Sequence, residues 1–279
     1  MKFNQEKAIK SLWAYLALCL LSITVLLPTL FMVFGSFKMQ SEVVSFPPKL
    51  FPKSFFYLEN FVKAWHKAPF GIYLTNSVIV GICTLLGVLI INTFAAYAFS
   101  HIKPWGSKFI FLLFMSGMII PPQVTVVPRY MLMQRFGLID SYAALILPFL
   151  TYPMGIFLLY QFFMTVPKEF EEAARIDGCG PFRFLVSILI PISRPTISAM
   201  SILTFVNSWN RYMWPLIVTN STRMRTAPIG IKMFLDETEG SHLGVMMAGA
   251  VIVITPVIIV FLLGQKHFVK ALAGGGVKG

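Results

Sequence analysis

The hydrophobic positions of this chain lie in long continuous runs, with little alternation between apolar and polar residues. Six stretches carry no Lys, Arg, Asp or Glu, and they cover residues 11–37, 68–100, 109–128, 141–167, 195–210 and 240–265. A helix needs about 20 apolar residues to cross the hydrocarbon core of a membrane. Lipid leaves helices and closed barrels as the ways to satisfy the backbone, and a barrel strand would alternate. The pattern therefore predicts six transmembrane helices, the fifth being the shortest.

Composition supports this prediction. Of the 279 residues, 57% are hydrophobic and 12% charged, whereas soluble domains average about 25% charged residues. The net charge is +12, but the 23 basic residues are spread over every loop without an aromatic-interleaved basic domain, so we expect no nucleic-acid partner. Contact with anionic lipid headgroups accounts for the charge. Three cysteines, an odd number, imply no disulfide framework.

The charges do not settle the orientation in the membrane. The basic N-terminus followed by a long apolar run, with no small-residue cleavage site, predicts a retained signal anchor with its N-terminus inside. With six spans, twelve basic residues then fall on the inner side and eleven on the outer side. The excess of Lys and Arg that usually marks cytoplasmic loops is therefore missing.

One polar loop, between the fourth and fifth runs, has the pattern of a complete short helix. Thr165 can cap it, Pro167 suits its first turn, and Gly178 suits a left-handed stop. Glutamates near its start suit the positive end of the helix dipole. A phenylalanine and two alanines share a small apolar face at helical spacing. Two interpretations stay open: a loop that lies on the lipid headgroups, or a short helix that docks in a cleft of another protein.

The spacing within this loop is specific. Glu172-Ala173-Ala174, three residues, Gly178, nine residues and then Ile188-Leu189-Ile190-Pro191 resembles the EAA loop of permease subunits of binding-protein-dependent ABC importers, EAA-x3-G-x9-I-x-L-P. Ile190 replaces the leucine, and Cys179 stands where a smaller residue is usual. The resemblance implies that the loop is cytoplasmic, as are both termini, and that it docks in a cleft of the ATPase subunit. The ATPase-coupling residues that it implies are Glu172, Ala173, Ala174, Asp177, Gly178, Ile188 and Pro191.

Further motifs resemble the carbohydrate branch of this family, specifically the maltose-transporter type second permease subunit. They are Phe46-Pro47-Pro48-Lys49-Leu50, Asn76-Ser77, Ala95-Ala96-Tyr97-Ala98, Trp209-Asn210, Trp214-Pro215-Leu216 and Gly275-Gly276-Val277-Lys278-Gly279. The resemblance implies an all-α polytopic fold of the type I (MetI-like) permeases with six transmembrane helices, forming half of a heterodimeric pore. The implied domains are an N-terminal helix with an extracytoplasmic amphipathic loop (1–69), the core (70–265) and a cytoplasmic tail (266–279), which either contacts the ATPase pair or frays.

Motifs for enzyme chemistry are missing from the sequence. It contains no GxxxxGK[ST], no HExxH and no GxSxG, and its four histidines are scattered, so we expect neither ATP hydrolysis nor a metal site in this chain. ATP and magnesium then belong to a partner. The resemblance implies a bacterial plasma (inner) membrane location, a second permease subunit, an ATPase subunit pair and an extracytoplasmic solute-binding protein as partners.

Candidate substrate contacts follow from sugar chemistry. Sugars stack their C–H faces on aromatic rings and offer hydroxyls to planar polar groups. Side chains of these kinds in or beside the predicted spans are Asn92, Tyr97, Tyr152, Asn207, Trp209 and Asn210. Helix–helix packing is the alternative role for each. The segment 49–67, rich in phenylalanine, lies either on the membrane surface or against the binding protein.

Arg211 is the charge that a spanning fifth helix has to accommodate. This helix reaches spanning length if it continues through Trp214 to Val218. Because Trp209, Tyr212 and Trp214 surround Arg211, its guanidinium either snorkels to the headgroups or lines the sugar path.

Two rival functions remain at this point. One is an ABC permease for another solute, such as a polyol, glycerol phosphate or a uronate oligomer, because the EAA loop does not report the substrate. The other is a secondary transporter. No Asp or Glu lies within the apolar runs to carry a proton or sodium ion, and no inverted repeat is visible, which disfavours this second rival.

Overall fold

The structure, a computed structural model, describes residues 2–232, 234 and 242–274, and side chains at 11–232, 234 and 242–266. The described residues form helices and turns, without strands. The chain divides into an N-terminal unit, Met1–Pro69 with Gly230–Ile254, and a core unit, Phe70–Ile229 with Thr255–Gly279. Helix α15 (Leu243–Gly274) contributes residues to both units. The predicted C-terminal motif 275–279 lies outside the described residues.

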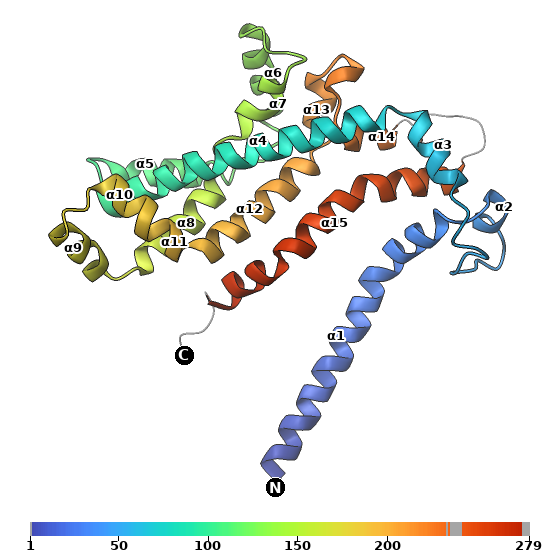
Figure 1. The fold of residues 1–279 in the computed structure, drawn as a ribbon, viewed down its shortest axis with the longest axis horizontal. Helices are drawn as coiled ribbons and strands as arrows, with labels where there is room; N and C mark the ends of the chain where they lie inside the picture. Colours follow the sequence, from blue (N-terminus) through green and yellow to red (C-terminus); the bar gives the residue numbers. More distant parts are fainter. Residues whose placement is uncertain (1, 233, 235–241, 275–279) are drawn as a thin grey trace. The chain divides into compact units, whose positions relative to one another are not determined.

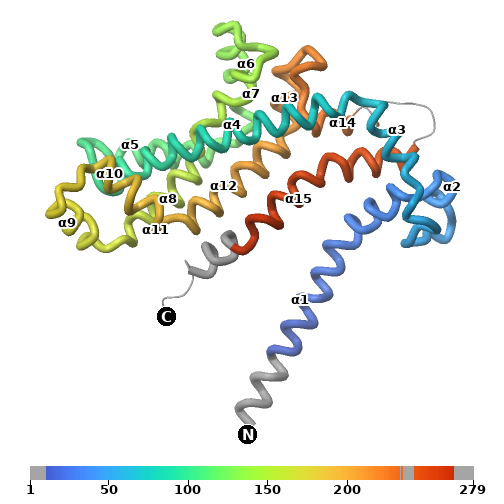
Figure 2. The backbone as a smooth tube through the Cα atoms, in the orientation of Figure 1, coloured from blue at the N-terminus to red at the C-terminus, as the bar shows by residue number. Residues whose placement is uncertain are grey.

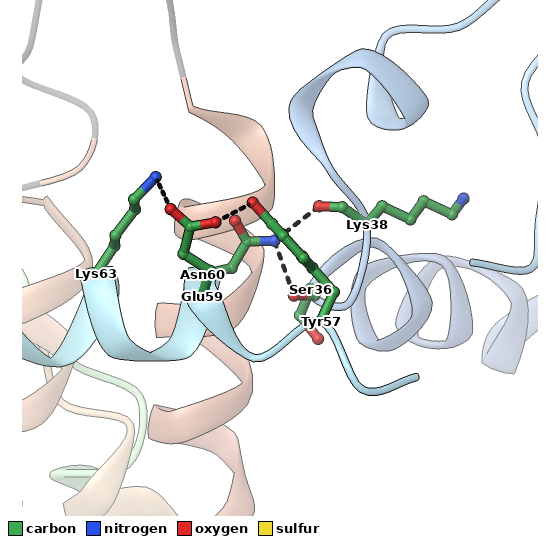
Figure 3. Close-up of polar contacts among 6 residues, drawn as sticks. All are labelled: Ser36, Lys38, Tyr57, Glu59, Asn60 and Lys63. Atoms are coloured by element: carbon green, nitrogen blue, oxygen red, sulfur yellow. Dashed lines mark hydrogen bonds and ion pairs between the residues drawn. The ribbon is translucent and has the colours of Figure 1, made fainter. Parts of the chain in front are cut away.

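The N-terminal unit begins with α1 (Lys2–Gly35), followed by two short helices, α2 (Gln40–Val43) and α3 (Glu59–Lys67). Figure 3 shows how the chain leaving α1 is held: the Asn60 amide donates to the carbonyls of Ser36 at 2.9 Å and Lys38 at 2.8 Å. Carbonyls at a helix end lack partners within the helix. The buried Asn60 side chain supplies hydrogen-bond donors to carbonyls just after α1, so α3 is fixed to the end of α1.

Lys38 is nearly inaccessible, with 1% of its surface exposed. Its ammonium donates to the Lys49 carbonyl and lies 5.2 Å from the centroid of the Phe31 ring. A buried ammonium is costly unless hydrogen bonds or charges compensate it. Lys38 therefore ties the start of the 49–67 segment to the end of α1.

The core unit is built on α4 (Phe70–Tyr97), which packs against α8 (Pro153–Thr165) and α12 (Arg194–Trp209) (Figure 1). Small residues allow the close approach. A Cβ on Gly81 would lie 2.9 Å from the Phe205 ring, and one on Gly155 would lie 2.6 Å from the Asn92 amide. Larger residues at these two glycines would push the helices apart.

The backbone trace in Figure 2 shows how the remaining elements of the core unit follow along the chain. They are η1 (Ala98–Ile102), α5 (Ser107–Ser116), α6 (Val126–Arg135), α7 (Tyr142–Ile146), η2 (Leu147–Phe149), α9 (Lys168–Ile176), α10 (Pro181–Phe184), η3 (Leu185–Leu189), α11 (Ile190–Ile192), α13 (Met213–Val218) and η4 (Thr222–Met224). Helix α14 (Ala227–Lys232) crosses the boundary between the units.

Three predicted spans are confirmed as continuous helices long and apolar enough to cross a membrane: 11–35, 70–102 and 243–266. The fourth span consists of two pieces, Tyr142–Phe149 and Pro153–Thr165, bent by 42°. Pro153 occupies the first turn of α8, where its missing N–H is not needed. If each bent helix pair is one span, the described residues contain up to five spans.

The prediction of a continuous third helix over 109–128 is wrong. Helix α5 ends at Ser116, turns follow, and α6 begins at Val126. The apolar run contains the Pro121-Pro122 pair, and proline neither donates a backbone hydrogen bond nor tolerates a helical residue before it. Residues 117–125 are therefore mostly apolar, as in a membrane helix, but their backbone is not helical.

The extension of the fifth helix through Val218 is also wrong. Helix α12 ends at Trp209, and α13 starts at Met213. In a continuous helix the ring of Pro215 would collide with the carbonyl of Arg211, four residues earlier. Restarting at Met213 places Pro215 in a first turn. Before α12 the chain bends by 80° from Pro181–Ile192, at Ser193.

Candidate functional site

The α8–α12 loop contains the short helix predicted from the EAA pattern. Helix α9 follows Pro167, which is extended with φ −61° and ψ 141° and acts as its N-cap residue without a side-chain cap. The predicted cap at Thr165 is wrong: α8 continues to Thr165, whose hydroxyl donates to the Phe162 carbonyl at 2.7 Å. Glu171 pairs with Arg175 at 2.7 Å on the exposed side of α9.

The end of α9 depends on Gly178. The Cys179 amide donates to the Ala174 carbonyl at 2.8 Å and the Gly178 amide to the Arg175 carbonyl at 3.0 Å, which together form a Schellman motif. Gly178 has φ 71°, the left-handed conformation that the sequence predicts for it. A Cβ there would meet no atom within 4 Å, so glycine is needed for its backbone conformation and not for space.

The two alanines of the EAA pattern face different surroundings. Ala174 is 5% exposed and packs inside the chain's own loop cluster. That cluster comprises Ala96, Tyr97, Leu159, Phe163, Ala174, Phe184, Leu185, Leu189 and Met200. Ala173 is exposed, as are Glu172 and Asp177, while Ile176 is 87% exposed. Helix α9 therefore anchors itself through Ala174 and presents a separate outer face around Ala173.

The second half of the loop completes the same packing. Ile188 packs against the loop cluster, and Pro191 lies in α11, just before the bend into α12. At the bend the fully buried Ser193 donates its hydroxyl to the Leu189 carbonyl at 2.7 Å. Both Ile188 and Leu189 belong to the π-helix η3. π-helical turns are rare and occur frequently at functional sites.

A second π-helix, η1, lies at the end of α4 beside this loop. Its His101 ring lies 5.7 Å from the Phe184 ring and 5.3 Å from the Tyr97 ring, measured between centroids, and Ser100 lies 2.8 Å from His101 Nδ1. Tyr97, a predicted substrate contact, is thus 6% exposed and part of the loop packing. The end of α4 and the α8–α12 loop form one packed body.

A cleft in the core unit brings together two of the six predicted substrate contacts. Its cavity volume is about 80 Å³, and it is partly open to solvent. Its lining residues are Val88, Phe149, Thr151, Tyr152, Thr204, Asn207 and Arg211. Tyr152 and Asn207 come from the start of α8 and the end of α12, and their side chains are within hydrogen-bonding reach of each other.

The other predicted contacts lie elsewhere. Asn92 is fully buried, and its amide donates to the Tyr152 carbonyl at 3.0 Å, so it positions a lining residue without reaching the cleft. Trp209 is 2% exposed and packs against Phe205, with the ring centroids 5.7 Å apart. Asn210 is exposed as the C-cap residue of α12 and is not among the lining residues.

Arg211 lines the cleft and does not stand among exposed aromatic rings. Its guanidinium carbon lies 3.5 Å from the centroid of the Phe149 ring. Trp214 is 5% exposed and donates its indole N–H to the Ala144 carbonyl at 3.0 Å, so it is part of the packed interior. Both interpretations of Arg211, snorkelling to the headgroups and lining the sugar path, stay predictions. Phe149, Thr151 and Thr204 also line the cleft but were not predicted, because no motif in the sequence marks them.

The Asn76-Ser77 motif serves the architecture of the core unit. The buried Asn76 amide donates to the carbonyls of Arg223 at 2.7 Å and Arg225 at 2.8 Å, and its oxygen accepts from the Tyr142 hydroxyl at 2.6 Å. The Ser77 hydroxyl accepts from the Ala227 amide at 2.8 Å. These two residues join α4 to segments about 150 positions later in the chain.

Asp140 closes a second connection, just outside the membrane-spanning pieces. Its carboxylate accepts the amides of Asn220 at 2.9 Å and Ser221 at 3.0 Å. Desolvation acts to raise the pKa of Asp140, but these hydrogen bonds and the charge of Arg225 outweigh it and hold the pKa below its usual value. The charged form of Asp140 is therefore favoured in the folded chain.

The 49–67 segment of the N-terminal unit presents several of its aromatic side chains to the outside. Phe51, Phe55 and Trp65 are between 46% and 65% exposed, and Phe56 is 92% exposed. Glu59 accepts from the Tyr57 hydroxyl and pairs with Lys63, both at 2.6 Å (Figure 3). Hydrogen bonds from Lys63 and Tyr57 lower the pKa of Glu59. The predicted contact with either membrane or binding protein stays a prediction.

Comparison with known proteins places this architecture in a family. Residues 89–274 match the family described as "Binding-protein-dependent transport system inner membrane component". The chain is 38% identical to the probable ABC transporter permease protein YurM of Bacillus subtilis, over 96% of this chain and 88% of that protein. It is 35% identical to the arabinooligosaccharides transport system permease protein AraQ of Halalkalibacterium halodurans, over 90% and 91%.

A solved structure shares the fold. The crystal structure of a bacterial ABC transporter involved in the import of the acidic polysaccharide alginate matches with a TM-score of 0.81, over 94% of this chain and 98% of that chain, at 22% sequence identity. This agreement confirms the predicted all-α permease architecture. The family match covers the α8–α12 loop and every lining residue of the cleft except Val88. The chain is a member of the binding-protein-dependent transport system inner membrane component family, the multi-pass permease subunits of ABC importers.

Proposed function

We propose that this chain forms half of the translocation path of an ATP-driven sugar importer and that the α8–α12 loop transmits the movement of an ATPase subunit. The observation that carries the proposal is the division of α9 into two faces. Ala174 packs into the chain's own interior, whereas Glu172, Ala173 and Ile176 are exposed. The exposed face of such a helix is available to a second protein, and its buried face can pass the movement of that protein to the rest of the chain.

The packing of the loop explains how movement would reach the membrane. Ala174, Phe184 and Leu185 share one buried cluster with Ala96 of α4 and Leu159 of α8. Packed interiors resist compression and transmit displacement. A pull on α9 would therefore displace α4 and α8 together, rather than deforming the loop alone. The bundle needs two packings that differ by a few kcal/mol, biased in turn by ATP and by substrate delivery.

The proposal assigns the remaining parts to partners. ATP and magnesium bind to the ATPase pair, a second permease subunit completes the pore, and an extracytoplasmic binding protein delivers the sugar. This chain then lies in a bacterial inner membrane with both termini in the cytoplasm. The family name, which specifies binding-protein-dependent transport, supports this set of partners.

A sugar is the proposed substrate class, with oligosaccharides favoured. One relative is named for arabinooligosaccharides and shares 35% of its residues over 90% of this chain. The cleft offers the Tyr152 ring and the Asn207 amide, groups that suit a sugar's C–H face and hydroxyls. We propose that these two residues, of the six predicted, contact the substrate.

The energy source can be tested in cells that express the complete transporter. Uptake of a radiolabelled oligosaccharide would be measured after ATP depletion by arsenate and, separately, after collapse of the proton gradient by an uncoupler with ATP maintained. The proposal expects uptake to stop under arsenate and to survive the uncoupler. Uptake that stops with the uncoupler while ATP is maintained would favour a secondary transporter instead.

A further inference from the structure

Two arginines from different elements meet at one aromatic ring of the cleft. The Arg211 guanidinium carbon lies 3.5 Å from the centroid of Phe149, and that of Arg129, from α6, lies 4.9 Å from the same centroid. Arg129 also lies 5.5 Å from the Trp214 ring. Rings attract cations through their faces, which explains how both side chains are held. Two positive charges are thereby held close together beside the cleft.

Neither arginine has an acidic partner in the part of the chain that the structure describes. Arg175 has Glu171 at 2.7 Å, but no described Asp or Glu forms an ion pair with Arg129 or Arg211. The polar contact of the Arg211 guanidinium is a long one, 3.5 Å to the Ser208 hydroxyl. The charged group that acts on Arg211 is Arg129, and the two positive charges repel each other. The N–H groups of Arg211 are therefore largely available to a ligand.

A buried hydroxyl in the cleft has no hydrogen-bond partner among the described residues. It belongs to Thr204, which lines the cleft and is 4% exposed. Buried hydroxyls are almost always hydrogen-bonded in folded proteins. The Thr151, Tyr152 and Asn207 residues add further polar groups to the lining of the cleft.

We propose that this cleft recognises an anionic group on the substrate, a carboxylate or a phosphate, and that Arg211 binds it directly with Arg129 adding charge behind it. The proposal rests on the sugar-import function above and narrows its substrate class to acidic sugars. A guanidinium offers a planar fork of donors that matches carboxylate and phosphate oxygens two at a time. The Thr204 hydroxyl completes the set as a further donor.

A neutral sugar fits the same cleft less well. Neutral sugars gain much of their binding from stacking on aromatic faces, but the guanidinium of Arg211 already covers one face of Phe149. A bound neutral sugar would also leave the positive charges of Arg211 and Arg129 without a counter-charge, whereas a bound anion offsets both. Charge-assisted hydrogen bonds are about twice as strong as neutral ones.

The test compares three probes on the complete transporter in lipid nanodiscs, freed of binding protein and without ATP. The probes are digalacturonate, its neutral counterpart digalactose and galactose 1-phosphate, each measured by equilibrium binding. The variants are Arg211→Gln, which removes the charge, and Arg211→Lys, which keeps the charge but not the fork. Arg135→Gln is the matched control, because Arg135 is an exposed arginine on the same helix as Arg129.

We expect digalacturonate or galactose 1-phosphate to bind about 10-fold to 100-fold more tightly than digalactose, the range that one or two charged hydrogen bonds allow. Whichever acidic probe binds more tightly decides whether the cleft prefers a carboxylate or a phosphate. Arg211→Gln should abolish the preference without weakening digalactose, Arg211→Lys should keep part of it, and Arg135→Gln should keep all of it.

Two results would overturn the inference separately from the function. If digalactose binds as tightly as both acids and is imported with ATP, the sugar importer stands and the anionic site does not exist. If the acids bind preferentially but Arg211→Gln leaves that preference intact, the anion is recognised elsewhere. If neither acid binds, the inference fails, whether or not the transporter imports digalactose.

Discussion

Leucine at Ala174 and leucine at Ala173 should damage the protein in different ways. Ala174 is 5% exposed inside the loop cluster, so three additional carbon atoms there have to displace Phe184 or Leu185. Overpacking of this kind costs about 1–3 kcal/mol, which corresponds to roughly a 5-fold to 150-fold increase in the undocked population of the loop. Ala173 is exposed, and surface substitutions usually stay within about 0.5 kcal/mol.

Trypsin separates the two effects, because Lys168 and Arg175 are exposed cleavage sites at the two ends of α9. Ala174→Leu should be cut in the loop about 5-fold to 150-fold faster than the wild type, where cleavage follows the undocked fraction. Ala173→Leu should be cut at the wild-type rate yet lose the co-purifying ATPase and transport. Ser187→Leu, at another exposed position of the same loop, is the control and should change neither readout.

One result would show that another protein does not dock on α9. If Ala173→Leu retains both the ATPase and wild-type uptake while Ala174→Leu does not, the outer face of α9 is not a docking surface. The loop would then be a structural element whose integrity alone matters, and coupling would have to occur elsewhere in the chain.

Three further predictions concern the core unit. Asn76→Ala removes three hydrogen bonds from a buried site and should lower the free energy of unfolding by about 2–4 kcal/mol, measured as a lower melting temperature in detergent with Ser77→Ala as a milder comparison. Gly155→Ala places a Cβ 2.6 Å from the Asn92 amide and 2.8 Å from a methionine sulfur, so it should reduce uptake by misplacing Tyr152; unchanged uptake would mean that the site relaxes. Because the folded chain lowers the pKa of Asp140, its stabilisation is present above the unfolded pKa of about 3.9 and disappears as pH falls through the lower folded value. Melting curves of Asp140→Asn should therefore lose part of the pH dependence below about pH 4, and parallel curves for both proteins would contradict this.

The sequence predicted the parts of the fold that depend on local composition. Spans such as 11–35 and 70–102 are continuous apolar runs, and a run of this length has few alternatives in a membrane. The failures occurred where proline interrupts an apolar run. Pro121-Pro122 ended the third helix and Pro215 ended the fifth, although hydrophobicity alone does not register either break.

The sites divide in the same way. The left-handed stop at Gly178 is a local property of the backbone, and the spacing of the EAA pattern located it. The cleft is a property of tertiary packing, because Phe149 and Arg211 meet from distant parts of the chain. Sequence spacing does not show that Asn92 is buried while Asn207 lines the cleft. The packing of the neighbouring helices decides which of these amides is enclosed within the protein.

The central claim is that this chain couples an ATPase to sugar import through the α8–α12 loop. The most direct measurement is the ATPase activity of the complex, purified in mild detergent after co-expression with its neighbouring genes and returned to lipid, with and without sugar-loaded binding proteins. We expect an ATPase to co-purify and one loaded binding protein to stimulate it, and we expect Ala173→Leu to abolish both. If no ATPase co-purifies with the wild-type chain, the loop is a surface helix and the coupling role is wrong.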